Sequence, residues 1–236
     1  MNTCLIFGAF GYFGFELARE LLEEGVKVIH VNIGDEFEPQ EYVTEKDFRV
    51  GRNANWKMIK EDLIPWREID VVIIPVCDWI YFPEDEQRVV EQRLKTYLAG
   101  NRNGKEVFIK TCGKEMIVPE LEKTARLIIA VPELYGGFQP PGSPFFKKLL
   151  KEEEPQPPQE ALPVQVVAQT VRELVENEEG QYILKPGNEE KRSGAEKTDA
   201  KKEGWRSVYI DVTDDERELA KLKQFISRCK RETTPG

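Results

Sequence analysis

The chain has 236 residues, of which 40% are hydrophobic, and a formal net charge of -9 at pH 7. This length can bury one good core. The charge argues against nucleic acid as a partner, because phosphate contacts need clustered Lys and Arg, and the basic residues here are interspersed with acids. No run of about 18 apolar residues and no basic signal-peptide start is present, so we expect a soluble, cytoplasmic protein without a membrane partner.

The cysteines and the histidine exclude several kinds of site. Cys4, Cys77, Cys112 and Cys229 include no C-x-x-C spacing, which predicts reduced thiols and neither a disulfide framework nor a metal pair. The one histidine, His30, lies inside an apolar strand pattern and is interpreted as structural. No metal site and no Ser-His-Asp triad is therefore predicted.

Short apolar runs alternate with helical patterns over the first 131 residues, as is typical of βαβ units and a parallel sheet. The expected strands are Thr3–Phe7, Lys27–Asn32, Asp47–Val50, Asp70–Cys77, Glu106–Thr111 and Leu127–Val131. The expected helices are Phe15–Glu24, Trp56–Ile64 and Glu86–Leu98. The predicted fold class is α/β, a Rossmann-like doubly wound parallel sheet with a small irregular C-terminal part.

The pattern loosens after the sixth strand, because Pro and Gly become frequent. The remaining expected elements are a helix near Phe145–Lys151, a helix over Pro163–Glu176, strands at Gly180–Leu184 and Val208–Val212, and a helix over Asp214–Arg228, with a charged mobile loop over Pro186–Glu203. We expect residues 1–135 to form a nucleotide-binding core and 136–236 a smaller, loop-rich part packed on it, within one domain overall.

The most informative motif is the glycine loop, which runs from Gly8 through Gly11 to Gly14 between a predicted strand and a predicted helix. Gly8 would permit a tight turn, Gly11 would let the backbone approach a pyrophosphate, and Gly14 would let the helix pack close to the strand. The free amides at the helix start would then face the phosphates. The alternative is a glycine-rich turn that binds nothing.

The G-x-x-G-x-x-G spacing, with aromatic residues between the glycines, resembles the extended short-chain dehydrogenase/reductase family, also described as NAD-dependent epimerase/dehydratase. Pro132–Gly137 looks like that family's Tyr-Gly-Pro turn, with Gly137 where proline is usual. Val164–Glu176, followed by Gly180–Leu184, looks like its late helix and following strand. The resemblance covers residues 1 to 185 in outline, and only the glycine loop is specific.

The resemblance implies NAD or NADP as the cofactor. Asn32 stands where the family usually has a ribose-binding acid, and it brings no charge that would distinguish the two cofactors. Arg52 would meet a phosphate or stay solvated on the surface. The full set of expected cofactor-binding residues is Gly8, Phe10, Gly11, Tyr12, Phe13, Gly14, Asn32, Arg52, Pro75 and Val76.

The family's catalytic Tyr-x-x-x-Lys pair is missing from its usual place. Thr111 or Cys112 stands about where the family has its substrate-binding hydroxyl, but residues 113–127 contain no tyrosine. Tyr135 has a glutamine at the fourth following position. A literal Tyr-x-x-x-Lys over Tyr42–Lys46 follows the second strand, on the adenosine side, and is interpreted as a coincidence.

Three functional hypotheses follow. The first is an NAD(P)-binding protein without the usual redox chemistry, acting as a sensor, regulator or structural partner. The second is an active oxidoreductase, epimerase or dehydratase on a small or sugar-like substrate, with Cys112, Tyr135 or Glu115 as a substitute acid. The third is a non-binding interaction module whose partner surface is formed by Cys77–Phe82 and Phe138–Phe146. The helix Glu86–Leu98 is a candidate for pairing two copies into a homodimer.

Overall fold

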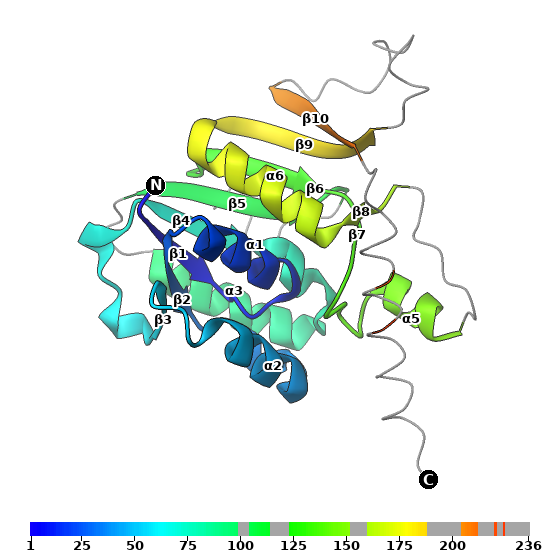
Figure 1. Ribbon diagram of the computed structural model, residues 1–236, viewed down its shortest axis with the longest axis horizontal. Helices are drawn as coiled ribbons and strands as arrows, with labels where there is room; N and C mark the ends of the chain where they lie inside the picture. The colour runs from blue at the N-terminus through cyan, green and yellow to red at the C-terminus, as the bar shows by residue number, and fades with distance from the viewer. Residues whose placement is uncertain are drawn as a thin grey trace.

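The computed structural model describes residues 1–98, 104–113, 123–151, 160–187 and 204–211, together with the single positions 220 and 224. Its centre is an eight-stranded sheet in the order β10-β9-β6-β5-β4-β1-β2-β3 (Figure 1). All neighbouring strands in this sheet are parallel. The predicted α/β class with a Rossmann-like doubly wound sheet is confirmed, because strand order reverses between β1 and β4.

The strands of the main sheet are β1 (Thr3–Phe7), β2 (Lys27–Val31), β3 (Trp56–Ile59), β4 (Val71–Pro75), β5 (Lys105–Thr111), β6 (Leu127–Val131), β9 (Gly180–Gly187) and β10 (Trp205–Asp211). The α-helices are α1 (Tyr12–Glu23), α2 (Gln40–Val50), α3 (Glu84–Leu98), α5 (Pro144–Lys151) and α6 (Val164–Asn177). Short 3-10 helices cover η1 (Asp35–Phe37), η2 (Glu61–Leu63), η3 (Trp66–Glu68) and η4 (Val76–Tyr81). A separate small sheet pairs β7 (Leu134–Tyr135) with β8 (Leu162–Pro163).

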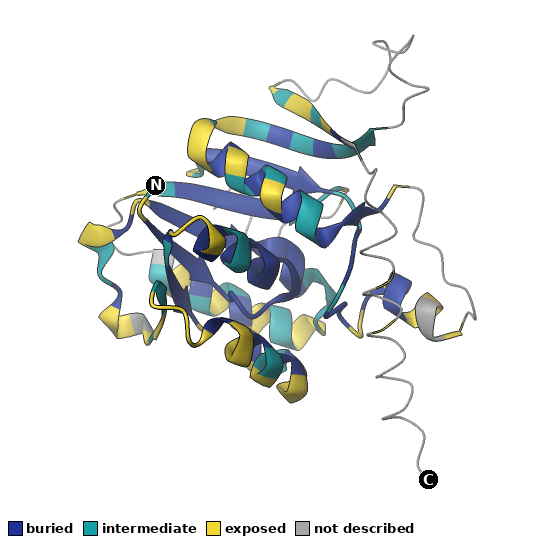
Figure 2. Ribbon diagram, viewed as in Figure 1, coloured by how far each residue is buried: buried dark blue, intermediate teal, exposed yellow. Residues whose placement is uncertain are grey.

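Both faces of the main sheet are covered, and successive strand residues alternate between them. Cys4 and Ile6 of β1 belong to the larger apolar cluster, which includes α1 and α6. Leu5 and Phe7 belong to the second cluster, on the α3 side. Figure 2 shows the central strands as almost continuously buried. Near-continuous apolar runs such as Leu127–Val131 are therefore explained by burial on both faces.

The prediction for the region after the second strand is wrong in its order of elements. Asp47–Val50, expected as a strand, is the end of helix α2, and the third strand is Trp56–Ile59, where a helix was expected. The buried residues of α2 are Tyr42, Lys46 and Val50, one every four positions, which is the spacing of one helix face. A buried lysine concealed this pattern from a reading based on apolar residues alone.

The later elements agree more closely with expectation. Helices α5 and α6 lie where they were predicted, while β9 is longer than expected and β10 begins three residues earlier. Residues 188–203, expected as a mobile loop, and nearly all of the predicted helix 214–228 lie outside the described residues. The division of the chain at residue 135 stays a prediction. Within the described part, no helix combines the length and the apolarity needed to span a membrane.

Candidate functional site

The glycine loop adopts the tight turn that its sequence predicts. Gly8 has φ +67° and its amide donates to the carbonyl of Val31 at 2.9 Å, and the amide of Gly11 donates to the carbonyl of Gly8 at 2.9 Å. Helix α1 then begins at Tyr12, with Gly11 as a cap residue that has no side chain to offer. The first amides of α1 therefore need an acceptor from elsewhere in the molecule.

That acceptor is Asp78. It lies in η4, directly after β4, and β4 is the neighbour of β1 at the point where the strand order reverses. One carboxylate oxygen accepts from the amide of Phe13 at 2.6 Å, and the other accepts from the amide of Gly14 at 2.8 Å. The Asp78 residue is only 2% exposed. A buried carboxylate thus caps α1 from a distant part of the chain and complements the positive end of the helix.

Gly11 is needed because Asp78 is so near. A Cβ at Gly11 would lie 2.8 Å from Cγ and 3.0 Å from Cβ of Asp78, and closer still to Oδ2. Gly14 is also confined, since its added Cβ would meet the carbonyl oxygen of Gly8 at 2.9 Å. The sequence predicts that Gly11 lets the backbone approach a pyrophosphate. In the structure, the group that approaches Gly11 is a carboxylate of the chain itself.

Trp79 fills the space beside Gly8 and Gly34, which is called the groove below. Its side chain would lie 3.2 Å from a Cβ at Gly8 and 3.2 Å from a Cβ at Gly34, which is the left-handed residue before η1. Trp79 is 1% exposed and belongs to the α3-side cluster. The carboxyl ends of β1 and β2 are therefore covered by an indole ring.

Lys46 supports the same loop from α2. Its buried Nζ donates to the carbonyl of Phe10 at 2.5 Å and to that of Gly11 at 3.3 Å, and lies 3.9 Å from a carboxylate oxygen of Glu38. The ring centroid of Phe138 lies 5.2 Å from Nζ, a cation-π distance. The literal Tyr42–Lys46 motif is thus built into the core, and its lysine serves the loop rather than the tyrosine.

Burial shifts the pKa values of these charged groups. The pKa of Asp78 is raised to about 7, because burial outweighs the two amide bonds from Phe13 and Gly14 that favour its charged form. Burial also raises the pKa of the Glu38 carboxyl, which Lys46 opposes. Burial lowers the pKa of the Lys46 ammonium, against the pull of Glu38 and Asp78. The loop is therefore surrounded by ionisable groups that are costly to keep charged.

His30 packs under the loop as part of an aromatic layer. Its ring lies 4.7 Å from the centroid of Phe10 and 5.4 Å from that of Trp56, and the residue has no exposed surface. Nε2 lies 2.8 Å from Oδ2 of Asp35, without an aligned hydrogen bond. Among the described residues, no group of three His, Cys, Asp or Glu side chains could hold a metal ion.

The aromatic residues of the loop are core residues. Phe10 and Phe13 are 2% and 0% exposed, and the hydroxyl of Tyr12 donates to Gln139 Oε1 at 3.0 Å. Pro75 contacts Gly14, since its Cγ would lie 3.3 Å from a Cβ there, and the Val76 side chain is buried.

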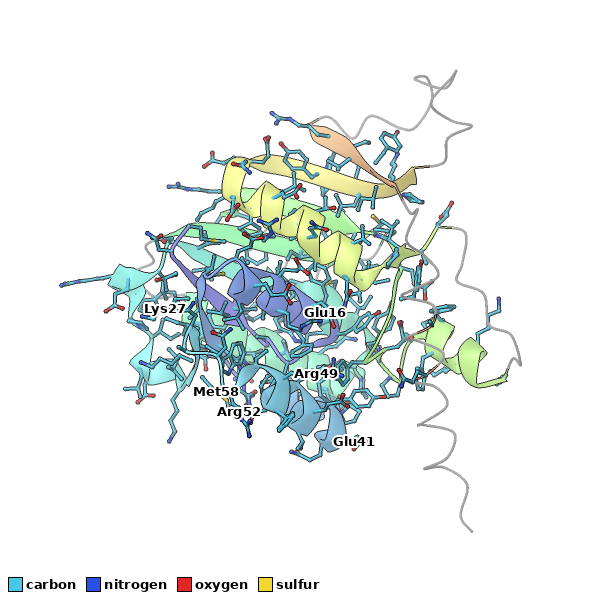
Figure 3. All side chains as sticks on the ribbon, viewed as in Figure 1. Glu16, Lys27, Glu41, Arg49, Arg52 and Met58 are labelled. Carbon is cyan, nitrogen blue, oxygen red and sulfur yellow. The ribbon has the colours of Figure 1, made fainter. Side chains whose placement is uncertain are left out.

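Asn32 and Arg52, the predicted polar contacts to the adenosine side, are both exposed. The Arg52 guanidinium lies over the ring of Phe48, 5.5 Å from its centroid, at the outer end of α2 (Figure 3). This arrangement matches the solvated alternative considered for Arg52. The structure therefore brings together the glycine loop, Pro75 and Val76, and leaves Asn32 and Arg52 on the surface.

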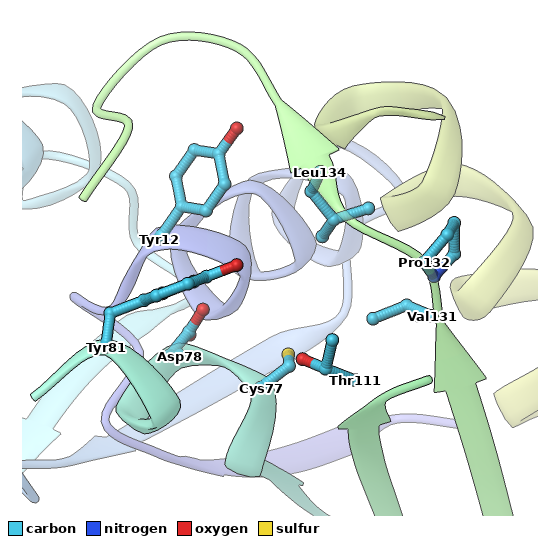
Figure 4. A pocket seen from close by; sticks show the side chains of 8 residues that line it. All are labelled: Tyr12, Cys77, Asp78, Tyr81, Thr111, Val131, Pro132 and Leu134. Carbon is cyan, nitrogen blue, oxygen red and sulfur yellow. The ribbon is translucent and has the colours of Figure 1, made fainter. Parts of the chain in front are cut away.

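A small cavity lies above the ends of β4, β5 and β6, on the side where the resemblance places substrate chemistry. Its volume is about 10 Å³, close to the minimum for one water molecule. The residues that line it are Tyr12, Cys77, Asp78, Tyr81, Thr111, Val131, Pro132 and Leu134 (Figure 4). Burial raises the pKa values of the Cys77 thiol and the Tyr81 phenol well above their usual range.

Of the catalytic candidates among the described residues, only Thr111 lines the cavity. Thr111 lines the cavity and Cys112, the next residue, is half-buried. Tyr135 is 1% exposed and packs edge-on against Phe145, with 6.2 Å between ring centroids. Glu115 lies outside the described residues. The cavity contacts of Thr111 make it the best placed of the candidates.

The aromatic partner surface expected from Cys77–Phe82 and Phe138–Phe146 is a wrong prediction for most of its members. Cys77, Trp79, Phe138, Phe145 and Phe146 are at most 6% exposed, so they form core and groove contacts. Aromatic residues in Pro-rich segments looked like surface because the sequence does not show which loops fold back onto the sheet.

Sequence reasoning missed Asp78 and the contacts of Lys46. A signal for Asp78 was present. Aspartate within the apolar run Val76–Tyr81 is unusual, because acids are almost never fully buried unless they have partners. Such an acid directly after a buried strand, at the edge where the glycine loop lies, could have suggested an internal cap.

Comparisons with known proteins give structural likeness only. No protein-family model and no curated protein matches the sequence. Solved structures that are similar include UDP-glucuronic acid 4-epimerase from Bacillus cereus in complex with NAD (TM-score 0.59, 14% identity, 96% of this chain and 99% of that one). Another is dTDP-glucose 4,6-dehydratase from Bacillus anthracis in complex with NAD (TM-score 0.58, 14% identity, 98% of both chains). Gre2 from Candida albicans in complex with NADPH matches over 75% of both chains (TM-score 0.50, 14% identity). The predicted resemblance to the extended short-chain dehydrogenase/reductase fold is confirmed.

The likeness raises the question of whether the residues present fit a dinucleotide. Among the amides that the start of α1 could offer a diphosphate are those of Phe13 and Gly14, and both already donate to Asp78. Trp79 covers Gly8 and Gly34 beside them. In the arrangement described here, the loop has the right backbone but does not fit the diphosphate.

Proposed function

We propose that this chain is a protein of the epimerase/dehydratase fold that lacks the usual Tyr/Lys redox chemistry and serves as a regulator or structural partner. The observation that carries the proposal is the space above β4, β5 and β6. It measures about 10 Å³, far less than the 300–1,000 Å³ of typical ligand pockets. No Tyr-x-x-x-Lys pair lines it. Thr111 lies at the edge of this space and is half-buried.

The test is a turnover assay on the full chain. Purified protein is incubated with NAD, NADH, NADP and NADPH, together with UDP-glucuronic acid or dTDP-glucose as probes. The reduced cofactor is followed by absorbance and the sugar nucleotides by chromatography. The proposal predicts no turnover above a protein-free blank. Turnover that falls in Thr111→Ala, Cys112→Ser or Tyr135→Phe would support the active-enzyme hypothesis instead, with the affected residue as its participant.

A second candidate function is dinucleotide binding without chemistry. The prediction of NAD or NADP as the cofactor is supported by the solved structures that resemble this chain, since they hold NAD or NADPH. The tight turn at Gly8 and the start of α1 at Tyr12 supply the backbone that such a cofactor requires. This candidate also requires Asp78 and Trp79 to leave the positions described above.

Titration separates the two candidates. Trp79 lies against the glycine loop, so its fluorescence reports on anything that enters the groove. Millimolar NAD(H) or NADP(H) that changes this emission and raises the melting temperature would establish the second candidate. A Trp79→Phe variant is the matched control. If this variant loses the fluorescence change but keeps the rise in melting temperature, the fluorescence change is assigned to the groove. No change in either signal supports the structural or regulatory proposal.

A homodimer in which two copies of the chain pair through α3 is also a proposal. The helix carries acids in its first turn and an exposed Val89 on its surface. Sedimentation at high concentration, with Val89→Glu as the variant, would detect pairing and its loss.

A further inference from the structure

We infer that the carboxyl group of Asp78 is a built-in acceptor of the glycine loop, and that it excludes a diphosphate from the start of α1. The two oxygens of Asp78 hold the amides of Phe13 and Gly14 at 2.6 Å and 2.8 Å. These are the amides that a helix start presents to an anion. The inference concerns occupancy of the groove, and it goes beyond the proposed function because a chain without turnover could still bind a dinucleotide.

The local chemistry explains why the loop holds an anion of its own. The cap position of α1 is a glycine without a side chain, so nothing nearby in the sequence satisfies the first amides. These amides are buried, and orphaned buried amides are costly. A carboxylate supplies two acceptor atoms at once and matches the positive helix end. Asp78 therefore does for α1 what a cap side chain or a bound phosphate would do.

Entry of a second anion would require Asp78 to leave together with its neighbours. The next residue, Trp79, is packed against Gly8 and Gly34. The far end of η4 is held to α3, because the Gln87 amide nitrogen donates to the carbonyl of Phe82 at 2.7 Å. The amide of Phe82 donates in turn to the carbonyl of Trp79 at 3.1 Å. Displacing one carboxylate thus means lifting a packed, hydrogen-bonded segment from the core.

The glycine spacing is consistent with this internal role. The Cβ that Gly11 lacks would overlap the Asp78 carboxylate, and the one that Gly14 lacks would lie 3.2 Å from Oδ2. Two glycines of the motif are thus explained by contacts within the chain. A sequence motif that suggests a ligand is here fully used by the protein itself.

The first experiment removes the anion. Asp78→Ala leaves the two amides without their acceptor, and inorganic phosphate is then added as the probe. The expected result is a lower melting temperature for Asp78→Ala that rises with phosphate concentration, relative to sodium chloride at equal ionic strength. The wild type and the control Asp85→Ala, which removes an exposed acid in the first turn of α3, should show no phosphate-specific rise. A phosphate-specific rise of equal size in the wild type, or no rise in Asp78→Ala, would overturn the inference.

A second measurement needs no variant and covers the case in which Asp78→Ala does not fold. Amide hydrogen exchange in the wild-type chain without any nucleotide should show Phe13 and Gly14 as protected as the interior of α1, because both donate to a buried carboxylate. Rapid exchange at both positions, slowed by NAD(H), would mean that the loop is open and takes a dinucleotide. If the loop proves open while the turnover assay above shows no reaction, only this inference fails, so its failure is distinguishable from a failure of the proposed function.

Discussion

Lys46, with no exposed surface, donates from its Nζ to the carbonyl oxygen of Phe10 at 2.5 Å. The same nitrogen lies 3.9 Å from Glu38 and also reaches the carbonyl of Gly11. One buried cation therefore neutralises the partial charges of two loop carbonyls and the charge of one carboxylate. This ammonium contacts the carbonyls of the loop, and the Asp78 carboxylate accepts from the amides that follow them.

We predict that Lys46→Met lowers the free energy of unfolding by about 3–5 kcal/mol, because it leaves Glu38 buried without its partner. The matched control is Lys27→Met, which breaks a surface pair with Glu68 at 3.4 Å and should cost at most about 1 kcal/mol. Urea denaturation measures both. If Lys46→Met costs no more than Lys27→Met, the loop does not depend on the buried ammonium. Adding Glu38→Gln to Lys46→Met should recover part of the loss.

The pKa of Asp78 gives the unfolding free energy a defined pH dependence. Its native value of about 7 lies above the value of 3.8 for an unperturbed aspartate, so the folded state binds more protons between these limits. The contribution of Asp78 to stability is therefore full below pH 4, declines as the pH rises towards 7, and is constant above. Glu38 faces the same site, and its raised pKa acts in the same direction. The lowered pKa of Lys46 acts in the opposite direction, because the unfolded chain then binds more protons and stability rises with pH up to the usual lysine value.

The measurement compares the wild type with Asp78→Asn by urea denaturation from pH 4.5 to 8. The asparagine keeps the shape of the side chain and cannot titrate, while Glu38 and Lys46 are present in both proteins. We expect the difference in unfolding free energy to change through this window and then to level off. A constant difference across the window would show that Asp78 does not titrate there.

More of the fold than of the site could be predicted from the sequence. Buried parallel strands such as Val71–Pro75 carry their apolar run in the sequence itself, and the spacing of Gly8, Gly11 and Gly14 fixes the turn after β1. The error at α2 arose because the buried face of this helix includes Lys46. That lysine can be buried because Glu38 and the loop carbonyls are its partners. No local pattern contains those partners.

The occupant of the loop could not be read from local sequence for a related reason. Phe13 and Asp78 are 65 residues apart in the chain, and they meet only because β1 and β4 are neighbours in the sheet. The sequence shows that a helix start needs an anion. It does not show whether the anion comes from a ligand or from another strand end.

Shortening the side chain of Trp79 tests whether this residue fills the groove. Trp79→Ala should lower the unfolding free energy by about 3–5 kcal/mol, because the ring is fully packed against Gly8, Gly34 and the α3-side cluster. Trp66→Ala is the control, since Trp66 is only partly buried at the edge of that cluster. Equal losses for the two variants would indicate that Trp79 does not fill the groove. Denaturation followed by circular dichroism avoids the change in fluorescence.

Gly11 and Asp78 should be coupled in a double-mutant cycle. Gly11 has φ -59°, so alanine is allowed by the backbone there, and the obstacle to Gly11→Ala is the Asp78 side chain. In the wild type, this substitution forces the carboxylate off the amides of Phe13 and Gly14. In an Asp78→Ala background, the carboxyl group that a methyl at Gly11 would overlap is gone, and only the Cβ of residue 78, 3.0 Å away, has to shift. We expect Gly11→Ala to cost about 1–3 kcal/mol less in that background.

The control for this cycle is Gly137→Ala, because nothing lies within 4 Å of a Cβ at that position. Its cost should be small and equal in both backgrounds. If the two losses at Gly11 and Asp78 are simply additive, the carboxylate does not stand over Gly11, and the loop is free to receive an anion from solution. A coupling seen at Gly11 and absent at Gly137 means instead that the motif is complementary to Asp78. The Asp78→Ala change removes the carboxyl group that a Cβ at Gly11 would meet, and it removes nothing near Gly137.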